Sequence, residues 1–411
     1  MTKTSLNSKS IKRHEIKDKT VLVRVDYNVP MDPGTTNIAD DSRILASIPQ
    51  IEYLLSRNCK VVLLSHLGRP DSSSGNVGRP DSSSGNEFSM MPITTRLSKI
   101  LGKPVLQLPS CKGKDVENQI NQSPHKSVSM LENIRFEAGE TKNDRNLSRA
   151  LANLADVYIN DAFGVAHRAH ASTEGITHYI PSYIGFLMQK ELDILGKLMS
   201  NPDRPMTSII GGVKASDKMG VLRNLSKTVD TIIIGGGMAA TFIKAKDFEV
   251  GSSKYEDDRL SEVRDLMEND KIRAELIIPT DVIVADRFHA DANFEVTDVD
   301  SIPENMIILD IGPRTAEKYA AIISGSSTVI WNGPMGVFEW KNFSSGTINV
   351  AKAIAGLKDG TTVVGGGSTA DVVSKLNMNN DVTHVSTGGG ATLKYLEGKP
   401  LPAIEAILKN D

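Results

Sequence analysis

Runs of glycine in the second half of the chain are the residues whose spacing most clearly suggests chemistry. Short β-branched apolar segments precede Gly211-Gly212, Gly235–Gly237, Gly365–Gly367 and Gly388–Gly390, and a fifth glycine-containing turn spans Asn332–Gly336. Glycine at the carboxyl end of a strand lets backbone N–H groups approach a phosphate, and the N-terminus of the next helix adds a favourable field. Tight turns also favour glycine, but five such turns in one half of the chain indicate nucleotide binding.

Two lysines accompany the first of these glycine runs. Lys214 and Lys218 lie in the segment 211–218, and Ser216 is predicted to be the N-cap of a helix that buries Val221, Leu222 and Leu225. The N-terminus of a helix favours anions, so two cations beside it are unfavourable unless an anion binds between them. We therefore expect both lysines to contact phosphate.

Polar side chains take the place of glycine in the first half of the chain. Arginine and histidine cluster after apolar segments, within 24–30, 65–70, 132–136, 160–164 and 167–170. Arginine offers planar bidentate donors for carboxylate and phosphate, so several arginines at strand ends predict a small substrate with several negative charges. His66, His167 and His170 lack a carboxylate at metal-ligand spacing, and we expect them to hydrogen-bond to substrate or near a hinge.

The elements that must position these residues read as an α/β fold. Buried apolar runs alternate with helical patterns, which is typical of parallel sheets with crossover helices. The predicted strands are 21–25, 60–65, 156–160, 207–210, 231–234, 276–278, 306–309, 328–331, 361–364 and 383–386. A long helix is predicted over 184–200, and glycine runs at strand ends occur only after it, so we expect a domain boundary near residue 183.

Composition excludes several classes of protein. The chain has 411 residues with 47 basic and 50 acidic side chains, a net charge of −3 that argues against a broadly basic nucleic-acid binder. Two cysteines cannot build a disulfide framework, and the polar first twenty residues do not resemble a signal peptide. No apolar run approaches membrane-spanning length, so we expect a cytoplasmic protein with no membrane partner.

A tandem repeat interrupts the first half. Residues 68–76 and 78–86 carry the same nine residues, rich in serine and glycine. This composition predicts a surface loop rather than a packed element. We interpret the duplication as a neutral insertion, with a regulatory or binding role as the alternative.

Eight segments of the chain resemble the phosphoglycerate kinase family over essentially the whole length. They are Arg-Val-Asp-Tyr-Asn-Val-Pro at 24–30, Ser-His-Leu-Gly-Arg-Pro at 65–70, Glu-Asn-Ile-Arg-Phe at 132–136, Asn-Asp-Ala-Phe-Gly-Val-Ala-His-Arg-Ala-His at 160–170, Gly-Gly-Val-Lys-Ala-Ser-Asp-Lys at 211–218, Ile-Gly-Gly-Gly-Met-Ala at 234–239, Trp-Asn-Gly-Pro-Met-Gly-Val-Phe-Glu at 331–339 and Ser-Thr-Gly-Gly-Gly at 386–390. Together these motifs are highly specific.

The resemblance implies a reaction and an architecture. The reaction is reversible transfer of the acyl phosphate of 1,3-bisphosphoglycerate to ADP, which gives 3-phosphoglycerate and ATP. The expected fold has two Rossmann-like three-layer lobes with parallel sheets, joined by a long interdomain helix and a hinge at 184–200 and Ser386-Thr387. Residues 1–183, with 400–411 packing back on them, would bind phosphoglycerate, and 184–399 would bind the nucleotide.

The resemblance also implies roles for individual residues. Phosphoglycerate would contact Asp26, Asn28, Arg43, His66, Arg69, Arg135 and Arg168. The nucleotide would contact Gly211, Lys214, Lys218, Gly235, Leu309, Asn332, Pro334, Val337, Gly366, Gly367, Ser368 and Thr369, with Glu339 on the ribose. Catalysis would fall to Arg43, Lys214, Lys218, Gly367 and Gly390, with Mg²⁺ carried mostly by the phosphates of ATP or ADP.

Two departures from the family pattern concern these roles. The family has an aspartate after the glycines at 365–367 where this chain has Ser368, so we expect Ser368 or Asp371 to take part in Mg²⁺ binding. The repeat supplies both Arg69 and Arg79 in Gly-Arg-Pro triplets, and we expect Arg69 to bind substrate because it directly follows the strand and His66.

Two other classes of function compete with this interpretation. A non-catalytic nucleotide-binding or scaffold protein is disfavoured because Arg43 and Lys218 are both present. A sugar-nucleotide or dinucleotide enzyme is disfavoured because neither Gly-x4-Gly-Lys-Ser/Thr nor a Gly-x-Gly-x-x-Gly turn opening a strand–helix–strand unit with a downstream acid is present. Small-molecule substrates and a monomer are expected.

Overall fold

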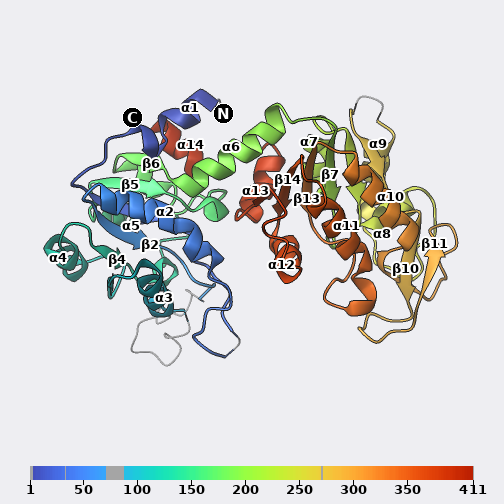
Figure 1. Ribbon diagram of the computed structural model, residues 1–411, viewed down its shortest axis with the longest axis horizontal. Coiled ribbons are helices and arrows are strands. Elements are labelled where there is room, and N and C mark those ends of the chain that lie inside the picture. The colour runs from blue at the N-terminus through green and yellow to red at the C-terminus, as the bar shows by residue number, and fades with distance from the viewer. Residues whose placement is uncertain (1–2, 33, 71–87, 270–271, 411) are drawn as a thin grey trace. The chain divides into compact units, whose positions relative to one another are not determined.

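The chain forms two compact units in a computed structural model, which describes residues 3–32, 34–70, 88–269 and 272–410 (Figure 1). The first unit comprises Met1–Gly196 and Pro400–Asp411, and the second comprises Lys197–Lys399. Residues 71–87, which hold most of the tandem repeat and Arg79, lie outside the described residues.

A six-stranded parallel sheet forms the centre of the first unit, in the order β3-β4-β2-β1-β5-β6. Successive residues of its central strands enter separate apolar clusters, with Val21 and Val23 on one face and Leu22 on the other. Both faces are therefore buried, which explains the continuous apolar runs. The strands are β1 (Thr20–Arg24), β2 (Lys60–Leu64), β3 (Val105–Gln107), β4 (Val128–Met130), β5 (Val157–Asn160) and β6 (Ser182–Ile184).

Helices cover both faces of this sheet. One cluster takes apolar side chains from α2 (Ser42–Ser56) and α3 (Met91–Leu101), and the other from α4 (Lys114–Gln122) and α5 (Arg145–Ala152). The C-terminal helix α14 packs beside β6, where the Ser182 N–H donates to Asn410 Oδ1 at 3.0 Å. The remaining helices are α1 (Lys3–Ser8), α6 (Phe186–Ser200) and α14 (Pro402–Lys409).

A second six-stranded parallel sheet, in the order β15-β14-β13-β7-β8-β9, forms the centre of the second unit. Its strands are β7 (Met206–Ile210), β8 (Thr231–Ile234), β9 (Glu275–Ile277), β13 (Thr328–Asn332), β14 (Thr361–Gly365) and β15 (His384–Val385). Its helices are α7 (Met219–Leu225), α8 (Ala239–Ala245), α9 (Leu260–Met267), α10 (Pro313–Ser324), α11 (Ser345–Ala355), α12 (Gly367–Lys375) and α13 (Gly390–Leu396). The predicted α/β class with parallel sheets is confirmed.

An antiparallel sheet of three strands was not predicted. It has the order β11-β10-β12, formed by β10 (Asp281–Ala285), β11 (Phe294–Asp298) and β12 (Ile307–Ile311). The strand expected at 306–309 therefore pairs in this sheet and not with the parallel strands. Apolar content predicted that strand, but it does not determine the direction of pairing.

The boundaries of the long helix also differ from the prediction. Helix α6 begins at Phe186, and Ile184 is instead the last residue of β6, where it pairs with Asn160. Ile184 is apolar and falls on the helical spacing, but its backbone completes the edge of the sheet. The sequence pattern alone does not separate these two uses of a buried isoleucine.

Candidate functional site

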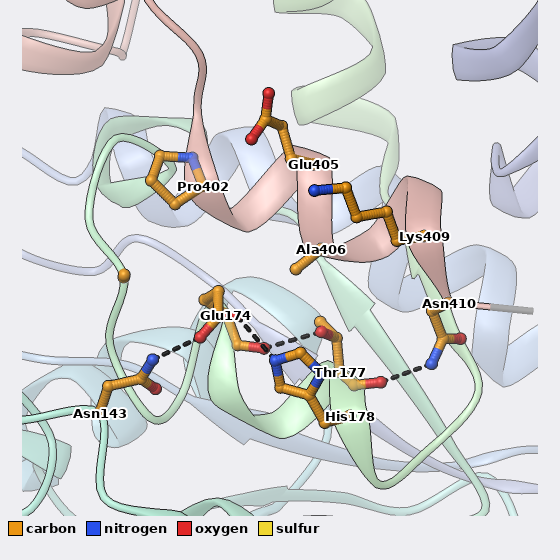
Figure 2. Close-up of a pocket in the computed structure, with 10 residues that line it drawn as sticks. Asn143, Glu174, Thr177, His178, Pro402, Glu405, Ala406, Lys409 and Asn410 are labelled. Carbon is orange, nitrogen blue, oxygen red and sulfur yellow. Dashed lines mark hydrogen bonds and ion pairs between the residues drawn. The ribbon is translucent and has the colours of Figure 1, made fainter.

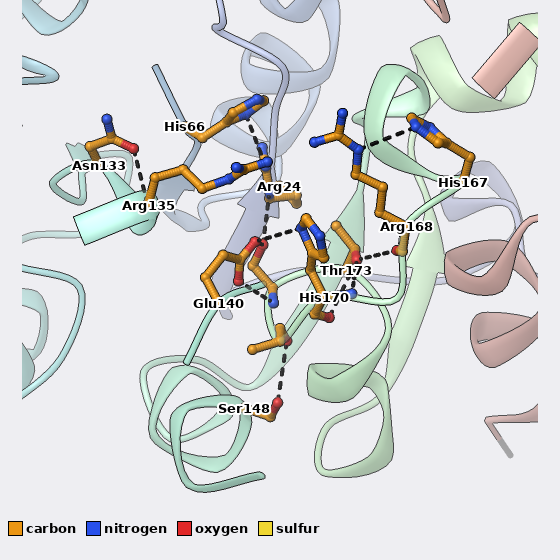
Figure 3. A network of polar contacts seen from close by, with 12 residues as sticks. Arg24, His66, Asn133, Arg135, Glu140, Ser148, His167, Arg168, His170 and Thr173 are labelled. Carbon is orange, nitrogen blue, oxygen red and sulfur yellow. Dashed lines mark hydrogen bonds and ion pairs between the residues drawn. The ribbon is translucent and has the colours of Figure 1, made fainter. Parts of the chain in front are cut away.

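Arg24 is the centre of a polar cluster at the carboxyl end of β1. Its side chain is 1% exposed, and its guanidinium donates to Ser172 Oγ at 3.1 Å, to the Val25 carbonyl and to His66 Nδ1 at 3.3 Å (Figure 3). Because β2 pairs in parallel beside β1, His66 reaches the same edge of the sheet. The sequence singled out the segment that contains Arg24 but assigned this residue no role.

The predicted substrate residues after β1 lie close together. An ion pair joins Arg43, near the start of α2, to Asp26, which is 7% exposed. Asn28 Oδ1 accepts the Gly68 N–H at 2.8 Å, and this bond ties the segment after β1 to the segment that carries Arg69. Parallel strands thus bring two distant motifs to one edge.

Positive charge accumulates around His66. Burial lowers the pKa of His66 well below its ordinary value, and the charges of Arg24, Arg135, Arg168 and Arg43 lower it further. Burial also lowers the pKa of Arg135 and of Arg168, and each is lowered further by neighbouring arginines that include Arg69 and Arg24. The predicted cations are therefore close enough to repel one another, as expected of a site that binds an anion.

One guanidinium nitrogen in this cluster is left without a partner. Arg135 Nε is buried and has no hydrogen-bond partner among the described residues. A buried donor of a charged group is costly to leave unpaired, so an anionic ligand is the natural partner for this atom. Figure 3 shows the side chain of Arg135 extending from the segment after β4 toward Arg24.

Glu140 is a buried carboxylate in the same cluster, and it was not predicted. It accepts the Ser172 N–H at 2.9 Å and the Ser172 Oγ–H at 2.6 Å, and its Oε1 lies 3.6 Å from His170 Nδ1. Burial alone would raise the pKa of Glu140, but His170, Arg24 and Ser172 together lower it below its ordinary value. Glu140 thus stabilises the cluster through Ser172, which accepts from Arg24, and its carboxylate also contacts His170.

Lys218 and Asn332 meet at the carboxyl ends of neighbouring strands in the second unit. Lys218 Nζ donates to Asn332 Oδ1 at 2.5 Å, and burial lowers the pKa of Lys218. Asn332 Nδ2 is buried and, in the described part of the chain, has no hydrogen-bond partner. A Cβ built on Gly365 or Gly366 would lie 3.2 or 3.3 Å from that nitrogen. The predicted lysine, amide and glycines thus share one edge of the sheet.

The glycines at this edge fall into two groups. A Cβ on Gly211 or Gly333 would collide with the backbone of the other turn, and a Cβ on Gly235 would collide with the Met335 side chain. These glycines allow the turns to pack together. By contrast, a Cβ on Gly367 or Gly389 would meet no atom within 4 Å. Open space beside the backbone therefore occurs at the starts of α12 and α13.

The residues predicted around the adenine also lie together. The Val337 N–H donates to the Leu309 carbonyl at 2.9 Å, and both side chains pack in one apolar cluster with Phe343. Gly235 and Pro334 lie in two turns that contact each other, because the Gly236 N–H donates to the Met335 carbonyl. Glu339 follows Val337 in the chain and is exposed. Thr369 Oγ1 accepts the Gly333 N–H at 2.7 Å. Of the other predicted residues, Gly390 is the first residue of α13, and Lys214 is exposed.

The prediction that Ser216 caps the following helix is wrong. Helix α7 begins three residues later at Met219, and the preceding Lys218 makes no side-chain cap. The Ser216 N–H and Oγ–H both donate to Glu256, at 3.0 and 2.5 Å. Ser216 therefore donates to a distant carboxylate and does not accept a helical N–H. No local pattern in the sequence links residues 40 positions apart.

The residues considered for Mg²⁺ lie within the first five positions of α12. Ser368 and Asp371 are both exposed, and in the part of the chain that the structure describes no three His, Cys, Asp or Glu side chains form a metal-binding group. One hydroxyl and one carboxylate fit an ion that keeps several waters and is bound mainly through phosphates. They do not fit a metal cage made by protein alone.

A hollow of about 590 Å³ lies elsewhere in the first unit, between α14 and the turn at Gly175–His178. It contains none of the predicted site residues. Figure 2 shows that its Glu174 carboxylate is already engaged by Asn143 and by His178, the latter at 2.7 Å. Glu405 and Lys409 add one charge of each sign. This hollow therefore lacks the excess of cations found around Arg24.

Comparisons with known proteins agree on one family. The sequence model described as phosphoglycerate kinase matches residues 11–399. A curated phosphoglycerate kinase from Moorella thermoacetica is 46% identical over 399 residues, which cover 97% of this chain and 98% of that protein. The solved phosphoglycerate kinase of Coxiella burnetii is similar with a TM-score of 0.84 and 36% identity, and that of Pyrococcus horikoshii with 0.81 and 30%. Each covers 97% of this chain and is itself covered to 98%.

Proposed function

The chain belongs to the phosphoglycerate kinase family of glycolytic kinases, which act on 3-phosphoglycerate with ATP, and we propose how its residues divide this reaction. The unit of residues 1–196 and 400–411 binds 3-phosphoglycerate, and the unit of residues 197–399 binds the nucleotide. The observation that carries this assignment is the buried Arg135 Nε, which lies within a cluster of arginines and has no hydrogen-bond partner in the described ranges of the chain. A cluster of this charge suits a ligand with a carboxylate and a phosphate.

Phosphoglycerate would be held by side chains. Arg135, Arg168 and Arg69 neutralise its phosphate, while Asp26, Asn28 and His66 orient its hydroxyl and carboxylate. Arg43 stays near Asp26 until substrate binds and then turns toward the carboxylate. The ion pair between Arg43 and Asp26 supports this role, because it holds a partly exposed cation beside the buried Asp26 carboxylate.

The nucleotide would be held largely by backbone. Lys214 and Lys218, with Asn332 and the N–H groups of Gly366, Gly367 and Gly390, lie along the phosphates, and Ser368 and Thr369 assist them. Gly211, Gly235, Leu309, Pro334 and Val337 flank the adenine, and Glu339 accepts from the ribose hydroxyls. Open space beside Gly367 supports the placement of a phosphate at the start of α12.

The chemical step needs positioning and charge neutralisation and no general base. A carboxylate oxygen of 3-phosphoglycerate attacks the γ-phosphorus of ATP, the new O–P bond forms, and the bond to the β–γ bridging oxygen breaks to release ADP. Arg43, from the unit proposed to bind phosphoglycerate, and Lys218, from the unit proposed to bind the nucleotide, would both hold equatorial oxygens of the transferring phosphoryl group. The two substrates must meet, so we propose that α6 and Ser386-Thr387 form a hinge and that closure excludes water.

Mg²⁺ is proposed to arrive with the nucleotide. When bound it supplies positive charge that stabilises the transferring phosphate. Ser368 or Asp371 would contact it directly or through water, and the remaining ligands would come from phosphates and water. We further propose a monomeric cytoplasmic enzyme. No helix among the described residues is both long and apolar enough to cross a membrane.

A coupled assay tests the proposed function. The purified chain is given 3-phosphoglycerate and MgATP, and formation of ADP is followed with and without excess chelator. We expect turnover that stops when chelator removes the metal. Binding of ATP without turnover would favour a non-catalytic nucleotide-binding protein, and turnover unchanged by chelator would contradict the role of Mg²⁺.

A further inference from the structure

Glu256 is a carboxylate outside the predicted site that contacts the lysine-bearing segment 211–218. Its two oxygens accept separately, Oε1 from the Ser216 hydroxyl at 2.5 Å and Oε2 from the Ser216 N–H at 3.0 Å. The Ala215 N–H also hydrogen-bonds to it. One side chain therefore satisfies three donors between the two lysines.

Outside Ala215 and Ser216, segment 211–218 is restrained by the Gly211 N–H, which donates to the Asn332 carbonyl, and by the Gly212 carbonyl, which accepts the Met238 N–H. Val213 is 83% exposed, and α7 starts at Met219 with no side-chain cap from its preceding residue. The Lys218 N–H and the Met219 N–H both donate to the Ala215 carbonyl, at 2.9 and 3.0 Å. Ala215 thus fixes the backbone of Lys218, and Glu256 in turn fixes Ala215 and Ser216.

Glu256 lies in a segment, residues 252–256, that is fixed by hydrogen bonds to other elements of the second unit. Its N–H donates to Thr241 Oγ1 on α8 at 3.2 Å. Upstream, Ser253 Oγ accepts the Ile308 N–H of β12 at 2.9 Å, and the Ser252 N–H donates to the Met306 carbonyl at 2.8 Å. The carboxylate is therefore held by two neighbouring elements of the same unit, which makes it a rigid support.

We propose that Glu256 is a positioning residue that fixes the backbone at Ala215 and Ser216 and so holds Lys214 and Lys218 in register with the phosphates of the nucleotide. This inference rests on the proposed function. Glu256 acts through the backbone and touches neither substrate nor transferring phosphate. A misplaced lysine weakens phosphate neutralisation even when its charge is kept.

A purely electrostatic role for Glu256 would have the opposite consequence. Burial alone would raise the pKa of Glu256, but the Ser216 and Ala215 hydrogen bonds and the charge of Lys214 lower it, so the group is ionised at neutral pH. An anion beside a phosphate site repels the ligand. If Glu256 acted only through its charge, removing that charge would tighten nucleotide binding. Loss of positioning would instead weaken nucleotide binding.

Two variants of Glu256 separate these roles. Glu256→Gln removes the charge and one acceptor, and Glu256→Asp keeps the charge but shortens the reach. Steady-state kinetics with each substrate varied, and melting temperatures, are measured for both. We expect kcat/KM for ATP to fall about tenfold in each variant, while KM for 3-phosphoglycerate stays within about twofold of the unaltered protein. Glu249→Gln is the matched control, because Glu249 is 81% exposed and pairs only with the Lys244 side chain among the contacts described for it.

The same measurements can overturn the proposal. An unchanged or lower KM for ATP in Glu256→Gln with unaltered kcat, or an equal rise in KM for both substrates, would rule out positioning. If the Glu256 variants fail to fold, Ser216→Ala removes the hydroxyl contact alone and should lower kcat/KM for ATP about threefold. An unchanged kcat/KM for ATP in Ser216→Ala would also contradict the positioning role of Glu256. Absence of turnover in the unaltered protein refutes the proposed function instead, and ADP affinity measured by calorimetry then tests Glu256 directly.

Discussion

The two units are proposed to recognise anions by different means. In the first unit the site is made of side chains, with Arg24, Arg135 and His66 drawn together at the edge of the sheet. In the second unit it is made mostly of backbone at the starts of helices, supplemented by Lys218 and Asn332. Guanidinium groups suit a small ligand whose charged ends need fixed directions, and backbone N–H groups suit a chain of phosphates.

The two units are also expected to respond differently to substitution. Crowded cations in the first unit lower one another's pKa, so ligand binding relieves a repulsion that is already present. In the second unit several turns of the candidate site depend on glycine, since Gly212, Gly333 and Gly366 hold positive φ angles that other residues rarely adopt. Variants of the arginines in the first unit should therefore affect ligand binding, whereas variants of the glycines and Lys218 in the second should affect stability, nucleotide binding or turnover.

The largest effect is expected for Lys218→Ala. Its ammonium is proposed to strengthen its contact as charge shifts during transfer, so kcat should fall by about 100- to 1000-fold. KM for 3-phosphoglycerate should remain unchanged, because that substrate is assigned to the other unit. Steady-state kinetics measure both. Lys318→Ala, at an exposed position on α10, is the control. A large rise in both KM values without loss of kcat would contradict the division of roles.

A smaller effect is expected when an arginine of the first unit is removed. Arg69→Ala should raise KM for 3-phosphoglycerate about 30-fold, since a charged hydrogen bond contributes about 2 kcal/mol. Arg79→Ala is the matched control from the duplicated Gly-Arg-Pro triplet and should leave KM unchanged. Steady-state kinetics with varied 3-phosphoglycerate show whether Arg69 or Arg79 binds this substrate. The reverse result would transfer the substrate role to Arg79.

Two glycines of the second unit should respond differently to the same substitution. Gly211→Ala places a methyl group against the Gly333 and Pro334 carbonyls, and we expect a loss of about 1–3 kcal/mol in the free energy of unfolding. Gly367→Ala meets no protein atom within 4 Å, so stability should change by less than about 0.5 kcal/mol while KM for ATP rises. Urea denaturation and kinetics test the pair. Equal losses of stability would show that both glycines serve packing alone.

The central strands of the parallel sheets could be predicted because they are buried on both faces, whereas the short strands β3, β4 and β6 were not predicted. Val21–Val23 and Val329–Trp331 read as continuous apolar runs and lie in central strands of the two sheets. Strand β11 could not be identified in this way, since Phe294 and Val296 are largely exposed. Strand β10 is buried throughout, but its antiparallel pairing depends on a neighbour that the local pattern does not specify.

The candidate site shows a similar limit. Arg43, Arg135 and Lys218 follow apolar segments or lie near helix starts, and within each unit the parallel strands bring their carboxyl ends to one edge of the sheet. Glu140 and Glu256 support the site through tertiary contacts with Ser172 and Ser216, 32 and 40 positions away. Nothing in the local pattern marks a supporting carboxylate. Residues that bear charge toward a ligand were therefore predictable, and those that hold them in place were not.

The smallest effect expected is a pH dependence of stability confined to the first unit. Burial and then the neighbouring arginines lower the pKa of His66 well below 6.5, so the folded state resists a proton that the unfolded state accepts. Stability contributed by neutral His66 is present above pH 6.5 and is lost as pH falls toward the folded pKa, by at most about 1.4 kcal/mol per pH unit.

His66→Asn keeps an acceptor for Arg24 but cannot be protonated in this range. The difference in free energy of unfolding between the two proteins, measured by urea denaturation from pH 7.5 to about 5, should therefore move in favour of His66→Asn as pH falls. Groups common to both proteins cancel in this difference, which isolates the one histidine. A constant difference would show that His66 is not held neutral, and the crowding of cations that distinguishes the first unit would then be weaker than the pKa shifts imply.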